Sequence, residues 1–193
     1  QEAANRQVTI YLLLDGFGSL SLPLETINKL KQSGINFRYF SPLFSANSFY
    51  LGRRLHQKVV VADAKVALIG GINIADKYHG TKNEKPWLDY AIQINGKIAA
   101  PLQELCKAIY FKEKKIQRKK ILPAFQPQQE ALIRILQNDW LNRKNEISNA
   151  YIKSIRNAKE EITIVGSYFL PGRKLTNALK KASQNKVRIR LIL

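Results

Sequence analysis

Strand-like and helix-like runs alternate along this chain, and that alternation constrains the fold more than any other feature of the sequence. Residues 8–14 and 35–40 have the apolar pattern of buried strands, and residues 23–34 between them carry apolar side chains at helical spacing. Because strand, helix and strand in succession form a crossover unit, the order predicts an α/β fold, a mixed β-sheet flanked by helices. At 193 residues, the chain is long enough for one sizeable domain or two small ones.

The middle of the chain predicts a β-hairpin. Two β-rich runs, residues 57–62 and 65–69, are hinged at Asp63-Ala64, and Gly70-Gly71 ends the second run. The remaining elements that we expect are a strand over 87–95, a helix over 98–109, a strand over 131–136, a helix over 147–158, a strand over 161–167, a helix over 171–183 and a strand over 187–193.

A basic segment separates these elements into two series and is the best candidate for a linker. Residues 112–120 are rich in lysine and arginine, and Pro123 and Pro127 follow them. Such a segment is typical of a solvated connection. We therefore predict a first domain over residues 1–122 and the beginning of a second domain over residues 123–193.

The two ends of the chain resemble each other. When residues 3–14 are placed over residues 182–193, an alanine, a valine, an isoleucine and two leucines coincide, and both segments have the pattern of a helix end followed by a strand. The alternative to an internal repeat is a chance match between two such junctions. If the repeat is genuine, the chain holds most of one domain and only the opening of a second. The absence of methionine, even as an initiator, agrees with a fragment.

The chain is strongly basic, with a formal net charge of +18, and 45% of its residues are hydrophobic. The hydrophobic content excludes a disordered basic tail, and the charge favours an anionic partner: nucleic acid, an acidic membrane surface or phosphate esters. A single cysteine excludes a disulfide framework and a cysteine-based zinc site. No apolar run approaches the roughly 18 residues that a membrane span needs.

The residues that carry chemistry surround the predicted hairpin. His56 and Lys58 are two positions apart at the start of a strand, so their side chains project from the same face. A neutral imidazole is a nucleophile or base, and a lysine beside it neutralises charge on a phosphoryl oxygen. Gly70 and Gly71 let the backbone approach closely, and Asn73 adds an amide donor. This set suits a phosphoester centre, where developing negative charge must be stabilised.

Each of these features also has a plainer interpretation. A single histidine at a strand edge is more often a surface residue, and paired glycines after a strand are usually a turn. Arg54, which follows Arg53, is either a bidentate phosphate ligand or half of a solvated pair. Residues 15–19 follow a strand at the end where α/β sheets place their sites, and turn chemistry is the alternative. No cluster of carboxylates or cysteines predicts a metal site, and we expect no cofactor.

The spacing of His56-x-Lys58, Asp63 and Gly70-Gly71-x-Asn73 resembles the HKD signature of the phospholipase D superfamily. Further stretches are similar to bacterial cardiolipin synthases, in particular to the short form without amino-terminal membrane helices. They include Leu13-Leu-Asp-Gly-Phe-Gly-Ser19, Asp89-Tyr-Ala-Ile-Gln-Ile-Asn-Gly96 and Ile162-Thr-Ile-Val-Gly-Ser-Tyr-Phe-Leu-Pro171. The resemblance covers nearly the whole chain and implies two phospholipase D-like lobes, the second of which is cut before its HKD motif.

The resemblance also implies roles for the motif residues. His56 would attack the phosphodiester and form a phosphohistidine, Lys58 and Asn73 would bind phosphate oxygens together with Gly70, Gly71 and Arg54, and Asp63 would hold the geometry of the motif. A histidine of the second lobe would act as general acid and base. The sequence departs from the family here because it has no second His-x-Lys, and we expect His79 to be a solvated loop residue.

The leading hypothesis is therefore a phosphatidyl transferase of cardiolipin synthase type. It would use phosphatidylglycerol at the cytoplasmic face of the bacterial membrane as a peripheral enzyme, with anionic phospholipid rather than nucleic acid as its partner. One alternative is a phosphodiesterase of the same superfamily that hydrolyses phospholipid or nucleic acid. Another, of a different class, is a non-catalytic basic module that binds anionic membrane. Superfamily nucleases with one motif pair identical chains, and a non-identical second lobe after Pro127 argues against that arrangement.

Overall fold

The computed structural model describes residues 1–40, 54–112, 133–139 and 144–193 of the chain. These residues fall into two compact units, Gln1–Glu130 and Ala131–Leu193, and each is described by itself. The predicted linker segment and the predicted boundary at 122/123 lie almost wholly outside the described residues, so the domain assignment stays a prediction. The expected α/β fold, with sheets flanked by helices, is confirmed.

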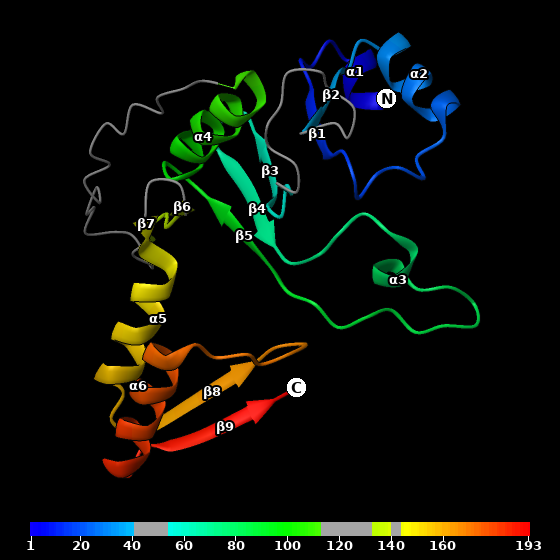
Figure 1. Cartoon of the computed structure of the whole chain (residues 1–193). Helices are drawn as coiled ribbons and strands as arrows, with labels where there is room; N and C mark the ends of the chain where they lie inside the picture. Colours follow the sequence, from blue (N-terminus) through cyan, green and yellow to red (C-terminus); the bar gives the residue numbers. More distant parts are fainter. Residues whose placement is uncertain (41–53, 113–132, 140–143) are drawn as a thin grey trace, which may run out of the picture. The chain divides into compact units, whose positions relative to one another are not determined.

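The first unit contains a parallel and an antiparallel sheet (Figure 1). In the order of the chain its elements are α1 (Glu2–Asn5), β1 (Tyr11–Asp15), α2 (Leu24–Gln32), β2 (Asn36–Phe40), β3 (Lys58–Ala62), β4 (Val66–Gly70), α3 (Asp76–His79), β5 (Ala91–Asn95) and α4 (Ala99–Phe111). Strands β1 and β2 pair in parallel, with α2 as the crossover helix. Strands β3, β4 and β5 form the antiparallel sheet in that order.

The predicted hairpin is confirmed, and its turn explains why the sequence folds back at this point. Asp63 and Ala64 both have a positive φ, 53° and 54°, as a two-residue turn with the twist of a hairpin requires. The amide of Lys65 donates to the carbonyl of Ala62 at 3.0 Å and closes the turn. The strand expected over residues 87–95 is shorter than predicted, because only its second half pairs with β4.

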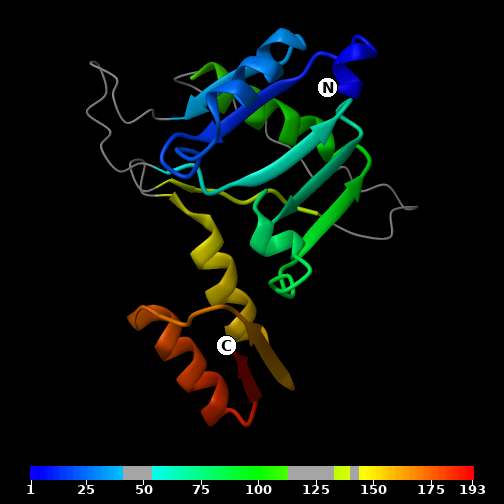
Figure 2. The same cartoon turned by 90° about the vertical axis from the view of Figure 1, so that its right-hand side faces the viewer.

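Helix α4 joins the two sheets of the first unit through its buried side. It contacts β3 and β4 (Figure 2). Ala99 and Leu102 of α4 are buried, and so is Ala67 of β4. At its other end the hydroxyl of Tyr110 donates to the carbonyl of Asn36 in β2 at 3.0 Å. Strands β3 and β4 therefore pack on a helix that is also bonded to β2 of the parallel pair.

The second unit is built around one parallel strand pair. Its elements are β6 (Asn138–Asp139), β7 (Lys144–Asn145), α5 (Glu146–Asn157), β8 (Glu161–Val165), α6 (Arg173–Gln184) and β9 (Arg188–Ile192). Helices α5 and α6 pack on each other, and their core contains Ile155, Ala178, Ala182 and Val187. The predicted helix–strand–helix–strand succession of this region is confirmed.

The prediction of a strand over residues 131–136 is wrong for residues 133–136, the part of it that the structure describes. Residues 133–137 have no regular structure, and the short strand β6 begins only at Asn138. Strand β6 pairs with β7 alone, over two residues. An apolar run gives no stable strand unless a neighbouring strand accepts its backbone hydrogen bonds, and the described part of this unit provides no such neighbour for residues 133–137.

The junctions that the repeat alignment places over each other have the same local geometry. The residue after α1, Arg6, and the residue after α6, Asn185, both have φ −84° and ψ 17°. The next residues, Gln7 and Lys186, have φ 63° and 65°. The amide of Val8 then donates a hydrogen bond to the carbonyl of Ala3, and the amide of Val187 donates one to the carbonyl of Ala182, each at 3.1 Å. These angles and hydrogen bonds agree with the repeat alignment.

Candidate active site

His56 and Lys58 lie where the chain enters strand β3. His56 is exposed and precedes the strand, and Lys58 is its first residue. The Lys58 ammonium donates to the His56 carbonyl oxygen at 2.9 Å, so the lysine side chain folds back toward the histidine. The structure thereby places the Lys58 ammonium at the backbone of His56, and a direct role of this cation beside the imidazole stays a prediction.

The paired glycines lie opposite this position in the sheet. Gly70 is the register partner of Lys58 on one side and of Ala91 on the other. A Cβ atom on Gly70 would come within 2.4 Å of the Tyr90 carbonyl oxygen, so no larger residue fits without a shift. The amide of Gly71 donates to that same oxygen at 3.1 Å. The glycines thus allow close strand packing beside the site, and their contact with phosphate stays a prediction.

Asn73 follows the glycines on the segment that leaves β4. Its amide nitrogen donates to the Tyr78 hydroxyl at 2.8 Å. An open pocket of about 440 Å³ surrounds this pair, and its lining residues are Ile72, Asn73, Ile74, Ala75, Asp76, Tyr78 and His79. His79 is exposed, as expected, but it ends the one-turn helix α3 rather than lying in a loop.

Asp63 lies at the far end of the hairpin from His56. It forms the turn between β3 and β4, whereas His56 precedes the start of β3. With a strand rise of about 3.3 Å per residue, the two are separated by roughly 15 Å or more along the sheet. This placement keeps Asp63 away from His56 along the hairpin, and its role in holding the geometry of the motif stays a prediction.

Asp15 anchors the segment that carries His56. Its Oδ1 atom accepts the Leu55 amide at 2.8 Å, and its Oδ2 atom accepts the Arg54 Nε at 2.8 Å and the Gly18 amide at 2.6 Å. Burial alone would raise the pKa of Asp15, but the hydrogen bonds from Leu55, Gly18 and Arg54 outweigh it and hold the pKa below its ordinary value. The end of β1 therefore fixes the two residues before His56.

This anchor changes the interpretation of Arg54. Its guanidinium is paired with Asp15 and lies over the Phe17 ring, 4.4 Å from the centroid. The sequence pointed to residues 15–19 only through their place after a strand, and nothing in it linked Asp15 to Arg54. The role of Arg54 as a phosphate ligand stays a prediction, and the structure adds a positioning role.

Asp89 is a further charged neighbour of the paired glycines, and no pattern in the sequence predicts its place there. A Cβ atom on Gly71 would come within 2.4 Å of Asp89 Oδ1, so the carboxylate occupies the space that the missing side chain leaves. Its Oδ1 also accepts the Tyr90 amide at 2.6 Å. Only the pairing of β4 with β5 brings Asp89 close to Gly70 and Gly71, and residue spacing in the sequence does not predict that pairing.

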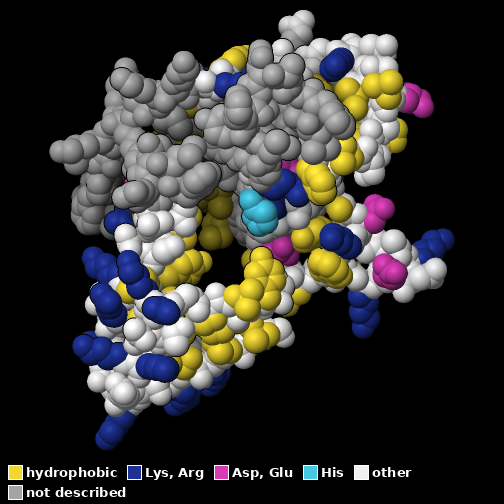
Figure 3. All heavy atoms as spheres, in the orientation of Figure 1, with side chains coloured by type: hydrophobic (Ala, Val, Ile, Leu, Met, Phe, Trp, Pro, Cys, Tyr) yellow, Lys and Arg dark blue, Asp and Glu magenta, His cyan; other side chains and the backbone are white. Residues whose placement is uncertain are grey.

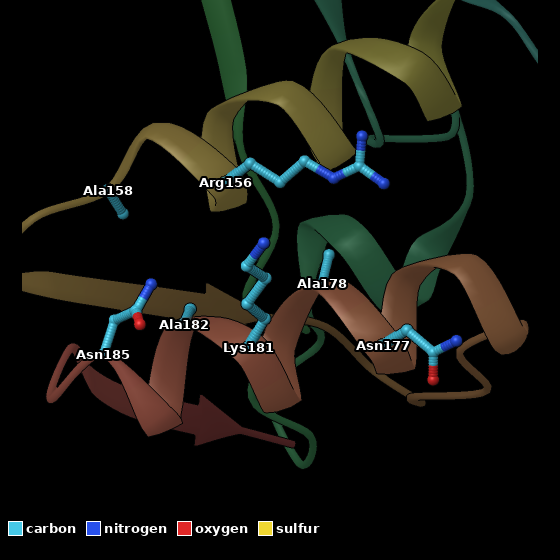
Figure 4. Close-up of a pocket in the computed structure, with 7 residues that line it drawn as sticks. All are labelled: Arg156, Ala158, Asn177, Ala178, Lys181, Ala182 and Asn185. Carbon is cyan, nitrogen blue, oxygen red and sulfur yellow. The ribbon is translucent and has the colours of Figure 1, made fainter.

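The second unit has a pocket of its own, of about 280 Å³, between α5 and α6 (Figure 4). Its lining residues are Arg156, Ala158, Asn177, Ala178, Lys181, Ala182 and Asn185. Arg156 and Lys181 stand in the last turns of their helices, where cations stabilise the negative end of the helix dipole. A structural role therefore explains both cations.

Two properties of the described residues bear on metals and membranes. Within the described ranges, no group of three or more histidine, cysteine, aspartate or glutamate side chains is placed to hold a metal ion. No helix in the same part of the chain is both long enough and apolar enough to cross a bilayer.

The fold and the motif define a phospholipase D-like domain. A family model described as "Cardiolipin synthase, PLD-like domain" matches residues 1–106 and 151–193. The chain therefore belongs to the cardiolipin synthase family of phospholipase D-like proteins, and the resemblance found in the motif is confirmed.

Relatives of this family match the chain from end to end. Cardiolipin synthase B of Shigella flexneri is 32% identical over 204 residues, which cover 99% of this chain and 48% of the relative. The same values hold for cardiolipin synthase B of Escherichia coli strain K12. Cardiolipin synthase A of Pseudomonas fluorescens strain Pf-5 is 31% identical over 194 residues, covering 100% of this chain and 40% of the relative. The chain thus spans about half the length of the curated relatives it matches.

Proposed function

We propose that the complete protein containing this chain is a phosphatidyl transferase of cardiolipin synthase type. It transfers a phosphatidyl group from phosphatidylglycerol to a second phosphatidylglycerol, or to a similar alcohol, and releases glycerol. The observation that carries the proposal is the Lys58 ammonium folded back onto the His56 backbone at the start of β3, in a chain of the cardiolipin synthase family.

The reaction has two steps at one phosphorus atom. In the first, an imidazole nitrogen of His56 attacks the phosphorus, a nitrogen–phosphorus bond forms, and the bond to glycerol breaks as glycerol takes up a proton. In the second, the hydroxyl of the acceptor attacks the phosphorus and loses its proton, and the bond to His56 breaks. Lys58 and Asn73 stabilise the charge that develops on the phosphoryl oxygens in both steps.

The proton donor and acceptor in this scheme come from a second lobe. We place its His-x-Lys about forty residues past Leu193, from the repeat alignment. A positioned general acid contributes about 10²–10⁴-fold in rate. We therefore expect the 193-residue chain alone to be nearly inactive. Robust turnover of phosphatidylglycerol by this chain without a second lobe would contradict that expectation.

The net charge of +18 supports a peripheral association with anionic phospholipid at the cytoplasmic face of the bacterial membrane. Nucleic acid has the same sign of charge, but the family membership favours the lipid. Competition between short DNA and phosphatidylglycerol vesicles for the complete protein tests this preference.

The decisive experiment follows the products of the complete protein on phosphatidylglycerol. Cardiolipin together with free glycerol indicates transfer, whereas phosphatidic acid indicates hydrolysis, because water then replaces the alcohol in the second step. His56→Ala removes the nucleophile and should abolish either product. Gln57→Ala is the matched control, because Gln57 is an exposed neighbour of His56 to which the proposed reaction gives no role. Unchanged products with His56→Ala would overturn the proposal.

A further inference from the structure

The segment between β4 and β5 exposes large apolar side chains close to the candidate site. We call residues 71–90 the β4–β5 excursion. Ile74 is 98% exposed and Leu88 is 81% exposed, and Ile72, Trp87 and Tyr90 are exposed as well. Figure 3 shows hydrophobic and basic side chains together on this side of the first unit. Apolar residues in such number on one excursion indicate a surface that meets a partner.

Hydrogen bonds hold the two arms of the excursion together. The Gly71 amide donates to the Tyr90 carbonyl at 3.1 Å, and the Trp87 amide donates to the Lys77 carbonyl at 2.8 Å. The Trp87 ring also packs against Tyr78, with 5.9 Å between centroids, and the Lys77 ammonium lies 4.4 Å from the Trp87 centroid. The exposed apolar side chains therefore project from a segment whose two arms are held together by hydrogen bonds and ring packing.

The composition of the excursion fits a bilayer better than a protein partner. Lysine is depleted at the cores of protein interfaces, yet Lys77, Lys82 and Lys85 accompany the exposed Ile74 and Leu88. Apolar side chains beside tryptophan, tyrosine and lysine are typical of segments that lie in the membrane interface, where an aromatic ring has one apolar and one wet side.

The position of the excursion connects this surface with the site. Asn73, a proposed phosphate ligand, stands between Ile72 and Ile74 and lines the same open pocket. A segment that brings Ile74 to the acyl chains therefore brings Asn73 to the level of the lipid phosphates. This link between the apolar surface and Asn73 rests on the proposed function, because it assumes that the substrate is a phospholipid of the bilayer.

We propose that the β4–β5 excursion inserts into the surface of a bilayer that contains anionic phospholipid. Ile74 and Leu88 enter the acyl region, Trp87 and Tyr90 lie at the interface, and Lys77, Lys82 and Lys85 lie near the phosphates. The carboxylates of the excursion, Asp76, Glu84 and Asp89, balance its lysines in number. Insertion therefore depends on the apolar side chains, while the net charge of +18 of the whole chain attracts the protein to the surface.

The test uses the complete protein and vesicles of equal parts phosphatidylglycerol and phosphatidylcholine. Leu88→Asp should lower the partition into these vesicles by about 10–100-fold, the loss expected for one inserted leucine. Leu24→Asp is the matched control, because Leu24 is 71% exposed in the same unit and stands in the first turn of α2, where an acidic residue is favourable. If both variants lose vesicle partition equally, or if Leu88→Asp loses none, the proposal is overturned.

A fluorescence measurement keeps the inference testable if Leu88→Asp fails to fold. A polarity-sensitive dye attached to a Leu88→Cys variant, in a Cys106→Ser background, should shift to the blue when vesicles are added. The same dye on a Leu24→Cys variant should not shift. A dye at position 88 that is already shielded before vesicles are added shows that another part of the protein covers the excursion, and this result rejects the membrane as its partner.

The outcomes for the inference and for the proposed function can be told apart. Activity on monodisperse short-chain phosphatidylglycerol needs no membrane insertion, so Leu88→Asp should leave it unchanged while activity on vesicles falls with the partition. Insertion without any transferase product would contradict the proposed function alone. Transferase activity on vesicles without a dye shift would contradict the inference alone.

Discussion

Arg54 Nε donates to Asp15 Oδ2 at 2.8 Å, and this bond ties the residue two positions before His56 to the end of β1. The Leu55 amide donates to the other oxygen of the same carboxylate. One side chain thus connects the parallel sheet with the entry into the hairpin that carries the candidate nucleophile. In the proposed reaction Asp15 is a positioning residue, because its contacts reach His56 only through the two residues before it.

The first prediction concerns Asp15→Asn in the complete protein. The neutral amide keeps the size of the side chain but loses the charge that binds Arg54. We expect kcat to fall about 10-fold, because a displaced His56 reaches the phosphorus less often, with little change in KM. Steady-state kinetics on short-chain phosphatidylglycerol measure both constants. Glu25→Gln is the control, because the Glu25–Lys29 pair on α2 is highly exposed and should contribute little.

A merely structural role of Asp15 predicts a different result. The fraction of folded protein would then fall, and KM and the pH profile of the surviving activity would stay as in the parent. A positioning role predicts that fully folded Asp15→Asn, checked by circular dichroism, has the lower kcat. Normal kcat in a folded Asp15→Asn variant would show that the anchor does not position His56.

The second prediction is a pH dependence of stability that arises from the same carboxylate. Because the pKa of Asp15 is lower in the folded protein than its ordinary value of 3.8, the ionised form contributes stability that is fully present above that value. This contribution disappears as the pH falls through the still lower folded pKa. Urea unfolding should therefore show parent and Asp15→Asn proteins well separated at neutral pH and converging at strongly acidic pH.

The size of that separation is limited by the exposure of the partner. The Asp15 side chain is only 13% exposed, but Arg54 is 48% exposed and solvent weakens the pair. We expect a difference of about 1–2 kcal/mol in the free energy of unfolding at neutral pH. A difference that stays constant from neutral to acidic pH would mean that the charge of Asp15 is not its cause.

The elements of this chain were predictable wherever local pattern decides the structure. The strand–helix–strand units, the hairpin and its turn at Asp63-Ala64 follow from periodicity and turn residues, and the structure has them with small shifts of their bounds. Residues 133–137 show the limit, because their apolar run has no described neighbour to complete a sheet. A strand is a property of two segments, so one segment cannot predict it alone.

The candidate site divides in the same way. The place of Lys58 opposite Gly70 was predictable, because the two-residue turn fixes the register of the hairpin. The Asp15–Arg54 bond and the place of Asp89 beside Gly71 were not, because each depends on how separate strands pack. Local spacing therefore predicts which motif residues the hairpin carries, and tertiary packing determines which side chains hold them.

The third prediction tests the close packing at Gly70. Gly70→Ala places a methyl group where only 2.4 Å separates it from the Tyr90 carbonyl oxygen, a backbone atom that cannot turn away. We expect a loss of about 1–3 kcal/mol in the free energy of unfolding, as for other overpacked sites, measured by urea titration. Gly172→Ala is the matched control, since no atom beyond its own chain neighbours lies within 4 Å of its Cβ position. Equal stability of the two variants would show that β4 and β5 are less closely packed than described.

The last prediction isolates the charge of Lys58. Lys58→Gln keeps a hydrogen-bond donor beside His56 but removes the cation, so charge on the phosphoryl oxygens is less well stabilised. We expect kcat of the complete protein on short-chain phosphatidylglycerol to fall about 10²–10³-fold, with a smaller change in KM. Lys65→Gln removes an equal charge from the exposed turn end of the same hairpin and should leave kcat within about two-fold of the parent. If both variants lose activity equally, the net charge of the hairpin matters rather than the cation at His56, and Lys58 has no special part in the reaction.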